Sequence, residues 1–158
     1  MIQKSLHSQL ASMKEYFDRS TRVLAEQDSE FAPAPGMLTA AQQIAHAAQT
    51  VEWFVSGAFA PDGFAMDFED QAKAIQATKS IAAAREWMNR AFVAAGQVVD
   101  AHGDQEWMAP LPEGPIMGGQ PRIAIFEGLY DHTAHHRGAL SVYSRLLGKV
   151  PAMPYMEM

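Results

Sequence analysis

Apolar residues return every three or four positions in four long segments of the chain. This is the spacing of residues that share one face of an α-helix. The pattern predicts helices over Ile2–Gln27, Thr39–Ala58, Lys79–Ala101 and Pro121–Leu147. Because each helix carries an apolar stripe, we expect the four helices to bury these stripes against one another. The sequence therefore predicts an all-α protein, a four-helix bundle.

Signals of helix ends agree with these ranges. Thr39, with Gln42 three residues later, is a capping-box pattern, in which each side chain bonds a free backbone amide of the other residue. The segment Phe31–Gly36 contains two prolines and a glycine, which cannot continue a helix. Pro121 suits a first helical turn, and Gly148 directly follows the last periodic residue.

Two long links separate the predicted helices. The link Ala60–Ala77 contains a predicted short helical turn over Glu69–Ile75. A link of this length allows the third helix to run parallel to the second instead of folding straight back. The link Asp104–Gln120 is rich in proline and glycine, and we expect Trp107–Met108 to form a short extended pair with Ile116–Met117. The bundle is thus predicted to have long crossover links.

Composition narrows the class of protein. Residues 1–158 are long enough for one domain with a substantial core, and a hydrophobic content of 48% is typical of globular proteins. A net charge of −6 without any run of lysine or arginine argues against nucleic acid or an anionic membrane as the main partner. The chain has no cysteine, which excludes thiolate ligands. No apolar run reaches the roughly 18 residues of a membrane span, and no signal pattern opens the chain, so we expect a cytoplasmic protein.

The most unusual segment of the chain is Asp131–Gly138, which holds three of the six histidines. His132 and His136 are four residues apart, so they share one face of the predicted helix and fall within its apolar stripe, whereas His135 points to one side. Two imidazoles at this spacing can bind one metal ion, which would require at least one further ligand. A pair of hydrogen-bonded core histidines is the alternative. Thr133 stands where an H-E-x-x-H metalloprotease has its glutamate, which disfavours that class.

His46 is less clear from the pattern alone. It lies on a flank of the apolar stripe of the second predicted helix, together with Gln42, Gln49 and Trp53. Such a position favours a surface or interface histidine over a metal ligand, although a flank can also face the interior of a bundle. Gln49 and Trp53 follow His46 by one and two helical turns and are candidate pocket neighbours.

The fourth predicted helix resembles a known family. His132–Leu140, followed by Tyr143 and Arg145–Gly148, is similar to the H-x-x-x-H-R-G-Q-L…L-R-x-x-G signature of the DinB/YfiT-like proteins. Thr39–His46, followed by Trp53, resembles the second-helix motif of that family. The four-helix layout with long links also agrees, so the resemblance covers nearly the whole chain. Ala139 replaces the usual glutamine, at a position that is not a ligand.

The resemblance implies a metal site. Carried over by position, it identifies His46, His132 and His136 as ligands of one divalent ion, nickel or zinc, with iron and manganese as alternatives. His135 is then adjacent without being a ligand, and Arg137 either joins the helix to a neighbour or is solvated. Family members often form homodimers, and some use the metal to activate a low-molecular-weight thiol.

Two classes of function remain open. The first is a metal-dependent enzyme acting on a small-molecule substrate, either a transferase or isomerase that activates a small thiol or a hydrolase that activates water. The second is a non-catalytic metal- or ligand-binding protein with a stress or sensory role, since the sequence offers no clear general base. We also expect a homodimer, because the broad apolar face of the third predicted helix, including Trp87 and Met88, exceeds what one bundle core requires.

Overall fold

The computed structural model describes residues 1–157. Its helices are α1 (Ile2–Thr21), α2 (Ala40–Phe59), α3 (Phe68–Ala77), α4 (Ile81–Ala101), α5 (Asp104–Met108) and α6 (Ile125–Leu146), with 3-10 turns η1 (Glu26–Asp28) and η2 (Arg122–Ala124). The described part of the chain contains no β-strand, and its β-type pairing is an isolated bridge between Pro110 and Pro121. The predicted all-helical class is confirmed.

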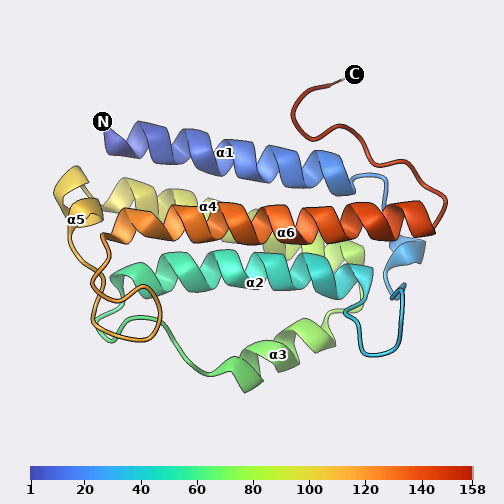
Figure 1. Ribbon diagram of the computed structural model, residues 1–158, viewed down its shortest axis with the longest axis horizontal. Coiled ribbons are helices and arrows are strands. Elements are labelled where there is room, and N and C mark those ends of the chain that lie inside the picture. The colour runs from blue at the N-terminus through green and yellow to red at the C-terminus, as the bar shows by residue number, and fades with distance from the viewer. Residues whose placement is uncertain (158) are drawn as a thin grey trace.

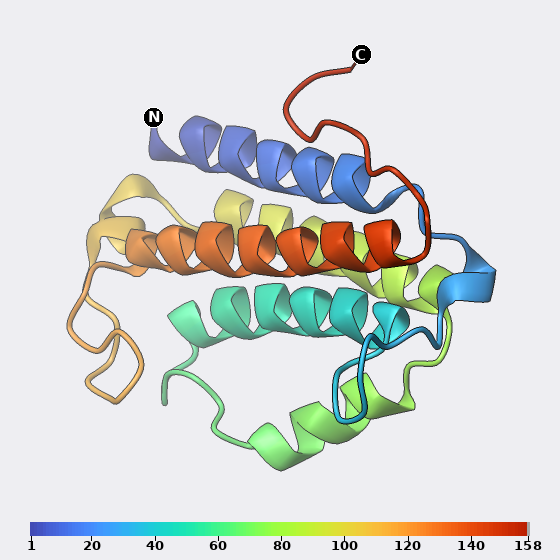
Figure 2. The same cartoon turned by 45° about the vertical axis from the view of Figure 1, so that its right-hand side comes forward.

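The four long helices α1, α2, α4 and α6 form the bundle (Figure 1). α2 packs against α4 and α6, and α1 packs against the same two helices, so each long helix has two neighbours. α1 and α6 run in one direction, and α2 and α4 run in the other (Figure 1). The link that contains α3 therefore joins two parallel helices, as predicted. Figure 2 shows α3 outside the bundle, on the side of α2.

The core forms where the four apolar stripes meet. Leu6 and Phe17 of α1, Ile44 of α2, Met88 of α4 and Leu140 of α6 are all fully buried. Burial of one such side chain contributes roughly 1.5–3 kcal/mol to folding. The stripes predicted from the sequence are therefore the surfaces that hold the bundle together.

The helix-end signals at Thr39 and Gly148 have the predicted geometry. The Thr39 hydroxyl accepts from the backbone amide of Gln42 at 3.2 Å, and the Gln42 side chain accepts from the amide of Thr39 at 3.0 Å. Gly148 has a φ of +74°, the left-handed conformation that glycine adopts readily at the end of a helix. These two ends fix where α2 begins and where α6 stops.

The first helix is shorter than predicted. It ends at Thr21 and does not reach Gln27. The Arg85 guanidinium of α4 donates to the backbone carbonyls of Thr21 at 2.8 Å and Leu24 at 3.3 Å. Carbonyls at a helix end need partners, and Arg85 supplies them from another element, which periodicity along one helix does not reveal.

The link after α4 also differs from the prediction. Trp107 and Met108 belong to α5 and do not pair with Ile116–Met117. The Glu106 side chain accepts from the backbone amide of Gly103 at 2.9 Å and thereby caps the N-terminus of this short helix. The helical turn lets Trp107 become fully buried.

Two further helices differ in extent. The predicted turn over Glu69–Ile75 is a helix of 10 residues, α3. The fourth long helix begins at Ile125, because Pro121 is followed by the 3-10 turn η2. In residues 1–157, no helix combines the length and the apolarity needed to cross a membrane.

The apolar face of α4 is largely used within the chain. Met88 is buried, and Trp87 is half-buried and donates its indole N–H to the Glu52 carboxylate at 2.8 Å. These two side chains therefore pack inside one bundle, and the homodimer remains a prediction supported by the family resemblance.

Candidate metal centre

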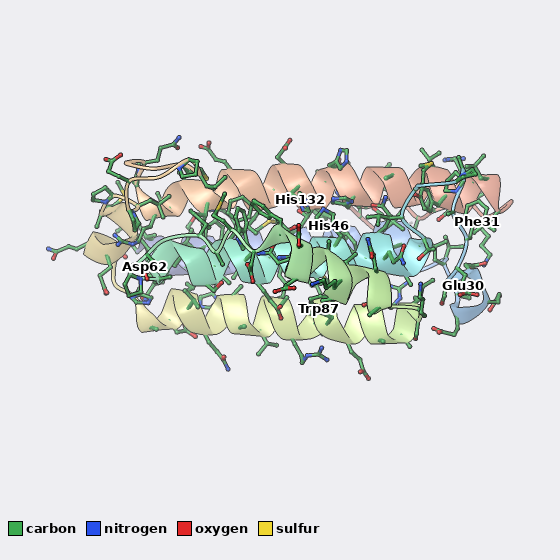
Figure 3. The ribbon with its side chains drawn as sticks, turned by 90° about the horizontal axis from the view of Figure 1, so that it is seen from below. Glu30, Phe31, His46, Asp62, Trp87 and His132 are labelled. Carbon is green, nitrogen blue, oxygen red and sulfur yellow. The ribbon has the colours of Figure 1, made fainter. Side chains whose placement is uncertain are left out.

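His46, His132 and His136 come together between α2 and α6. Figure 3 places His46 and His132 next to one another near the middle of the bundle. The ring centroid of His46 lies 4.9 Å from that of His132 and 4.8 Å from that of His136, and the two α6 rings are 4.3 Å apart. One ring nitrogen from each residue lies within 4.8 Å of the other two, an arrangement that can hold a metal ion.

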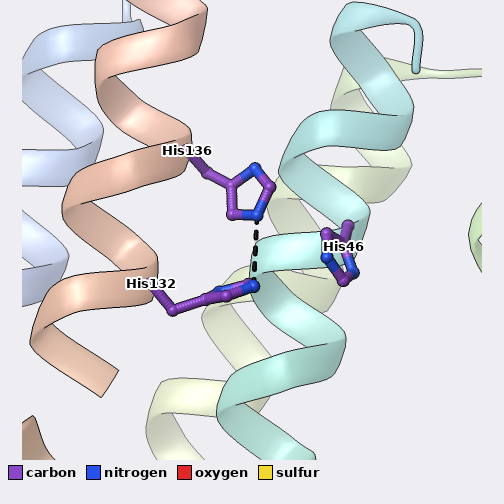
Figure 4. Close-up of side chains that lie close together, drawn as sticks. All are labelled: His46, His132 and His136. Carbon is purple, nitrogen blue, oxygen red and sulfur yellow. Dashed lines mark hydrogen bonds between the residues drawn. The ribbon is translucent and has the colours of Figure 1, made fainter. Parts of the chain in front are cut away.

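The helical spacing of His132 and His136 sets their contact. Their Nε2 atoms lie 3.1 Å apart (Figure 4), with the ring of His46 facing them from α2. Two nitrogens that bind the same zinc ion at about 2.0–2.1 Å can be separated by at most roughly 4.2 Å. The pair on α6 already satisfies this limit, and with His46 all three donor nitrogens lie within 4.8 Å, so the donor set comes close to what a divalent ion requires.

Burial keeps the three imidazoles neutral. Desolvation lowers the pKa of His132 to about 4 and that of His136 to about 3, and the neighbouring imidazoles add to both shifts. Desolvation also lowers the pKa of His46, with a contribution from His135. At neutral pH each ring therefore keeps a lone pair available for a metal.

Two nitrogens of the cluster have no partner in the described part of the chain. Nδ1 of His46 and Nδ1 of His132 are buried and lack a hydrogen-bond partner among residues 1–157. A buried polar atom left without a partner costs free energy. Three clustered imidazoles with two unpartnered Nδ1 atoms are thus an unfavourable arrangement for a purely structural core. An ion bound at Nε2 of His132 would leave its Nδ1 unpartnered, so the metal–nitrogen bonds would have to offset this cost.

Two further side chains of α2 contact the cluster. Gln43 meets Nδ1 of His136 at 2.5 Å through its side-chain oxygen, and the Thr50 hydroxyl lies 3.4 Å from Nε2 of His132. Gln43 and Thr50 lie three residues before and four residues after His46, so all three share one face of α2. In the sequence, Gln43, His46 and Thr50 form a row of polar residues at helical spacing. The prediction instead placed His46 on a flank with Gln42, Gln49 and Trp53, and so it did not identify this row.

The neighbours chosen from the sequence make different contacts. Gln49 donates to the Gln71 side chain at 2.9 Å, and the Trp53 indole donates to the Ala65 carbonyl at 2.7 Å. Both side chains line a shallow pocket of about 370 Å³ beneath α3. Their hydrogen bonds therefore attach α3 and its preceding link to α2 and do not support the imidazoles.

The remaining candidates of the fourth helix lie outside the group of three histidines, although the ring of His135 packs edge-on against that of His136 with centroids 4.9 Å apart. His135 is exposed, and it is outside the group of three histidines. Arg137 donates to the Tyr155 hydroxyl at 3.3 Å and lies over the rings of Tyr16 and Tyr155. Arg137 thus joins α6 to α1 and to the C-terminal segment, one of the two roles considered from the sequence.

These features define a class of protein, namely a four-helix bundle with a cluster of three histidines between two of its helices. The chain belongs to the DinB superfamily, whose family model matches residues 9–140. The matched region includes all three clustered histidines. A search of curated proteins found no match.

Proposed function

We propose that the protein is a metal-dependent enzyme whose divalent ion is held by His46, His132 and His136. The observation that carries this proposal is the convergence of three neutral imidazoles, one buried and two half-buried, from two helices, with donor nitrogens within 4.8 Å of one another. The pairing of His132 with His136 follows from their spacing on α6, and packing of α2 against α6 brings His46 to them.

The number of protein ligands favours catalysis. Structural zinc sites are usually closed by four protein ligands, whereas catalytic sites keep a position for water or substrate. When bound in such a site, a divalent ion lowers the pKa of a water or thiol and polarises a substrate. The Thr50 hydroxyl, 3.4 Å from Nε2 of His132, adds a hydrogen-bonding group beside the cluster.

A small thiol is the preferred nucleophile in this proposal, and water is the alternative. The chain contains no cysteine, so a thiol must arrive as a substrate. The resemblance to thiol-using DinB-like proteins supports transfer or isomerisation of a small molecule. The same resemblance supports a homodimer as the assembly that carries this activity.

A non-catalytic role is the second candidate. The three histidines come from α2 and α6, so a shared ion would cross-link two helices of the bundle. A cross-link of this kind stabilises the fold without chemistry at the ion, and it suits a metal- or ligand-sensing protein.

The test combines metal content with activity. Elemental analysis of the untagged protein should give one nickel or zinc ion per chain, since a histidine tag would itself recruit metal. The loaded protein is then supplied with cellular thiols and a panel of electrophiles, with His132→Ala as the inactive variant and His135→Ala as the matched control. Turnover that persists unchanged in His132→Ala would overturn the proposal of catalysis.

A further inference from the structure

We propose that Gln43 is a positioning residue that fixes the tautomer of His136, so that the lone pair of its Nε2 faces His132 and a bound metal. The inference rests on the proposed metal site, but it concerns a hydrogen-bond relay that exists without metal. The relay joins His136 to Gln43, Gln43 to Tyr143, and Tyr143 to the backbone carbonyl of Leu38.

The direction of the relay follows from its fixed end. A backbone carbonyl can only accept, so the single hydroxyl proton of Tyr143 is donated to Leu38, at 2.9 Å. The Tyr143 oxygen then accepts from the side-chain nitrogen of Gln43, at 3.3 Å. This orients the amide of Gln43 with its oxygen toward Nδ1 of His136.

The orientation of the amide sets the proton on the imidazole. An amide oxygen only accepts, so Nδ1 of His136 must carry the proton, and Nε2 of the neutral ring keeps its lone pair. Nε2 is the atom that lies 3.1 Å from Nε2 of His132. Metal-binding histidines commonly donate their other N–H to a neighbouring acceptor, which fixes the ring orientation and raises its basicity.

The surroundings hold the relay in place. Tyr143 is 2% exposed and His136 is 6% exposed, so water competes little for these hydrogen bonds. The ring of Phe31 packs edge-on against the Tyr143 ring, with centroids 5.9 Å apart. Leu38 directly precedes Thr39, the capping residue of α2. The acceptor at the end of the relay is therefore attached to the same helix end that positions Gln43.

Gln43 acts on His136 and not on the whole cluster. Nδ1 of His46 and Nδ1 of His132 have no comparable acceptor within residues 1–157. Substitution of Gln43 should consequently change the tautomer of one identifiable ring, which makes the inference open to a direct test.

The first measurement is nitrogen NMR on metal-free protein with ¹⁵N-labelled histidine. Long-range ¹H–¹⁵N correlations show which ring nitrogen carries the proton. We expect Nδ1–H for His136 in the unmodified protein and a mixture of tautomers in Gln43→Met, which keeps the size of the side chain and removes the acceptor. Gln43→Glu should retain Nδ1–H, because its carboxylate still accepts.

The second measurement is zinc affinity by competition with a chelator. Loss of such an outer partner typically weakens metal binding roughly 10–100-fold, and we expect this range for Gln43→Met. Gln49→Met is the matched control: it removes a half-buried glutamine of α2 whose hydrogen bond goes to Gln71, and it should leave the tautomer and the zinc affinity unchanged.

Each outcome has a distinct meaning. An Nε2–H tautomer of His136 in the unmodified protein, or an unchanged Nδ1–H signal in Gln43→Met, would overturn the inference. Unmodified protein that shows Nδ1–H but binds no zinc would contradict the proposed function and leave the tautomer assignment supported. Gln43→Glu keeps the test decisive if Gln43→Met proves unfolded by circular dichroism.

Discussion

A Cβ atom at Gly128 of α6 would lie 2.8 Å from Cζ of Phe54 on α2, closer than two carbon atoms pack. The absence of a side chain at this glycine lets the Phe54 ring lie directly against the backbone of α6. Gly128 lies one helical turn before His132, and the contact therefore sets the separation of α2 and α6 next to the histidine cluster.

We predict that Gly128→Ala destabilises the protein, because its new methyl group must displace the Phe54 ring or separate the two helices. Overpacking of this kind costs about 1–3 kcal/mol. The measurement is urea unfolding of the metal-free protein, together with zinc affinity, which should fall as the two helices separate.

Gly138→Ala is the matched control for this prediction. Gly138 lies in the same helix, and a Cβ there would meet nothing within 4 Å. Alanine at an unhindered helical position stabilises by roughly 0.5–1 kcal/mol relative to glycine. If both substitutions changed stability in the same direction and by the same amount, the packing argument would be wrong.

Much of the fold was predictable because its causes are local. Four amphipathic stripes, the Thr39 capping box and Gly148 predicted the bundle and two of its helix ends. The premature end of α1 was not predictable in this way, because Arg85, from a distant segment, donates to the carbonyls of Thr21, the last residue of the helix, and of Leu24 just beyond it.

The same difference between local and long-range causes applies to the candidate site. His132 and His136 share one helix, so their proximity follows from spacing alone. The position of His46 depends on how α2 lies against α6, which contacts between helices such as that of Phe54 with Gly128 determine. The contact of Gln43 with the cluster was not predictable for the same reason, since its partner His136 is 93 residues away in sequence.

Three substitutions should each remove most of the bound metal, namely His46→Ala, His132→Ala and His136→Ala. Each change deletes one of three nitrogens that converge within 4.8 Å, and two nitrogens hold a divalent ion poorly. His135→Ala should retain the metal, because His135 is exposed and outside the group. Elemental analysis of the untagged variants provides the measurement. Metal retained by His136→Ala but lost from His135→Ala would show that the ligand set is wrongly assigned.

Metal should also raise the stability of the fold, because the three ligands converge only when α2 packs against α6. At a free zinc concentration of 100 times Kd, the expected gain is about 2.7 kcal/mol, which corresponds to a rise in Tm of roughly 5–10 °C for a chain of this length. Thermal unfolding with zinc and with excess chelator measures the difference. His135→Ala should show the full rise and His132→Ala almost none; an equal rise in both would place the stabilising ion elsewhere.

The metal-free protein should lose stability as the pH falls below 6.5. The ordinary pKa of histidine is 6.5, whereas burial, with the neighbouring imidazoles, lowers the pKa of His132 to about 4 and that of His136 to about 3 in the folded state. Between these values the unfolded chain binds protons that the folded chain excludes, and the free energy of unfolding decreases. The stabilising contribution of the neutral rings is thus complete above pH 6.5 and is lost as the pH falls toward 4 and 3.

Urea unfolding between pH 6.5 and about 5 isolates this effect from that of the carboxyl groups. Glu26 and Glu157 have folded pKa values below their ordinary value of 4.5, so their stabilising contribution is lost only at more acidic pH. His132→Gln removes one of the titrating rings, and its free energy of unfolding should fall less steeply over the same window. Equal slopes for the unmodified protein and His132→Gln would show that the acid sensitivity does not come from the histidine cluster.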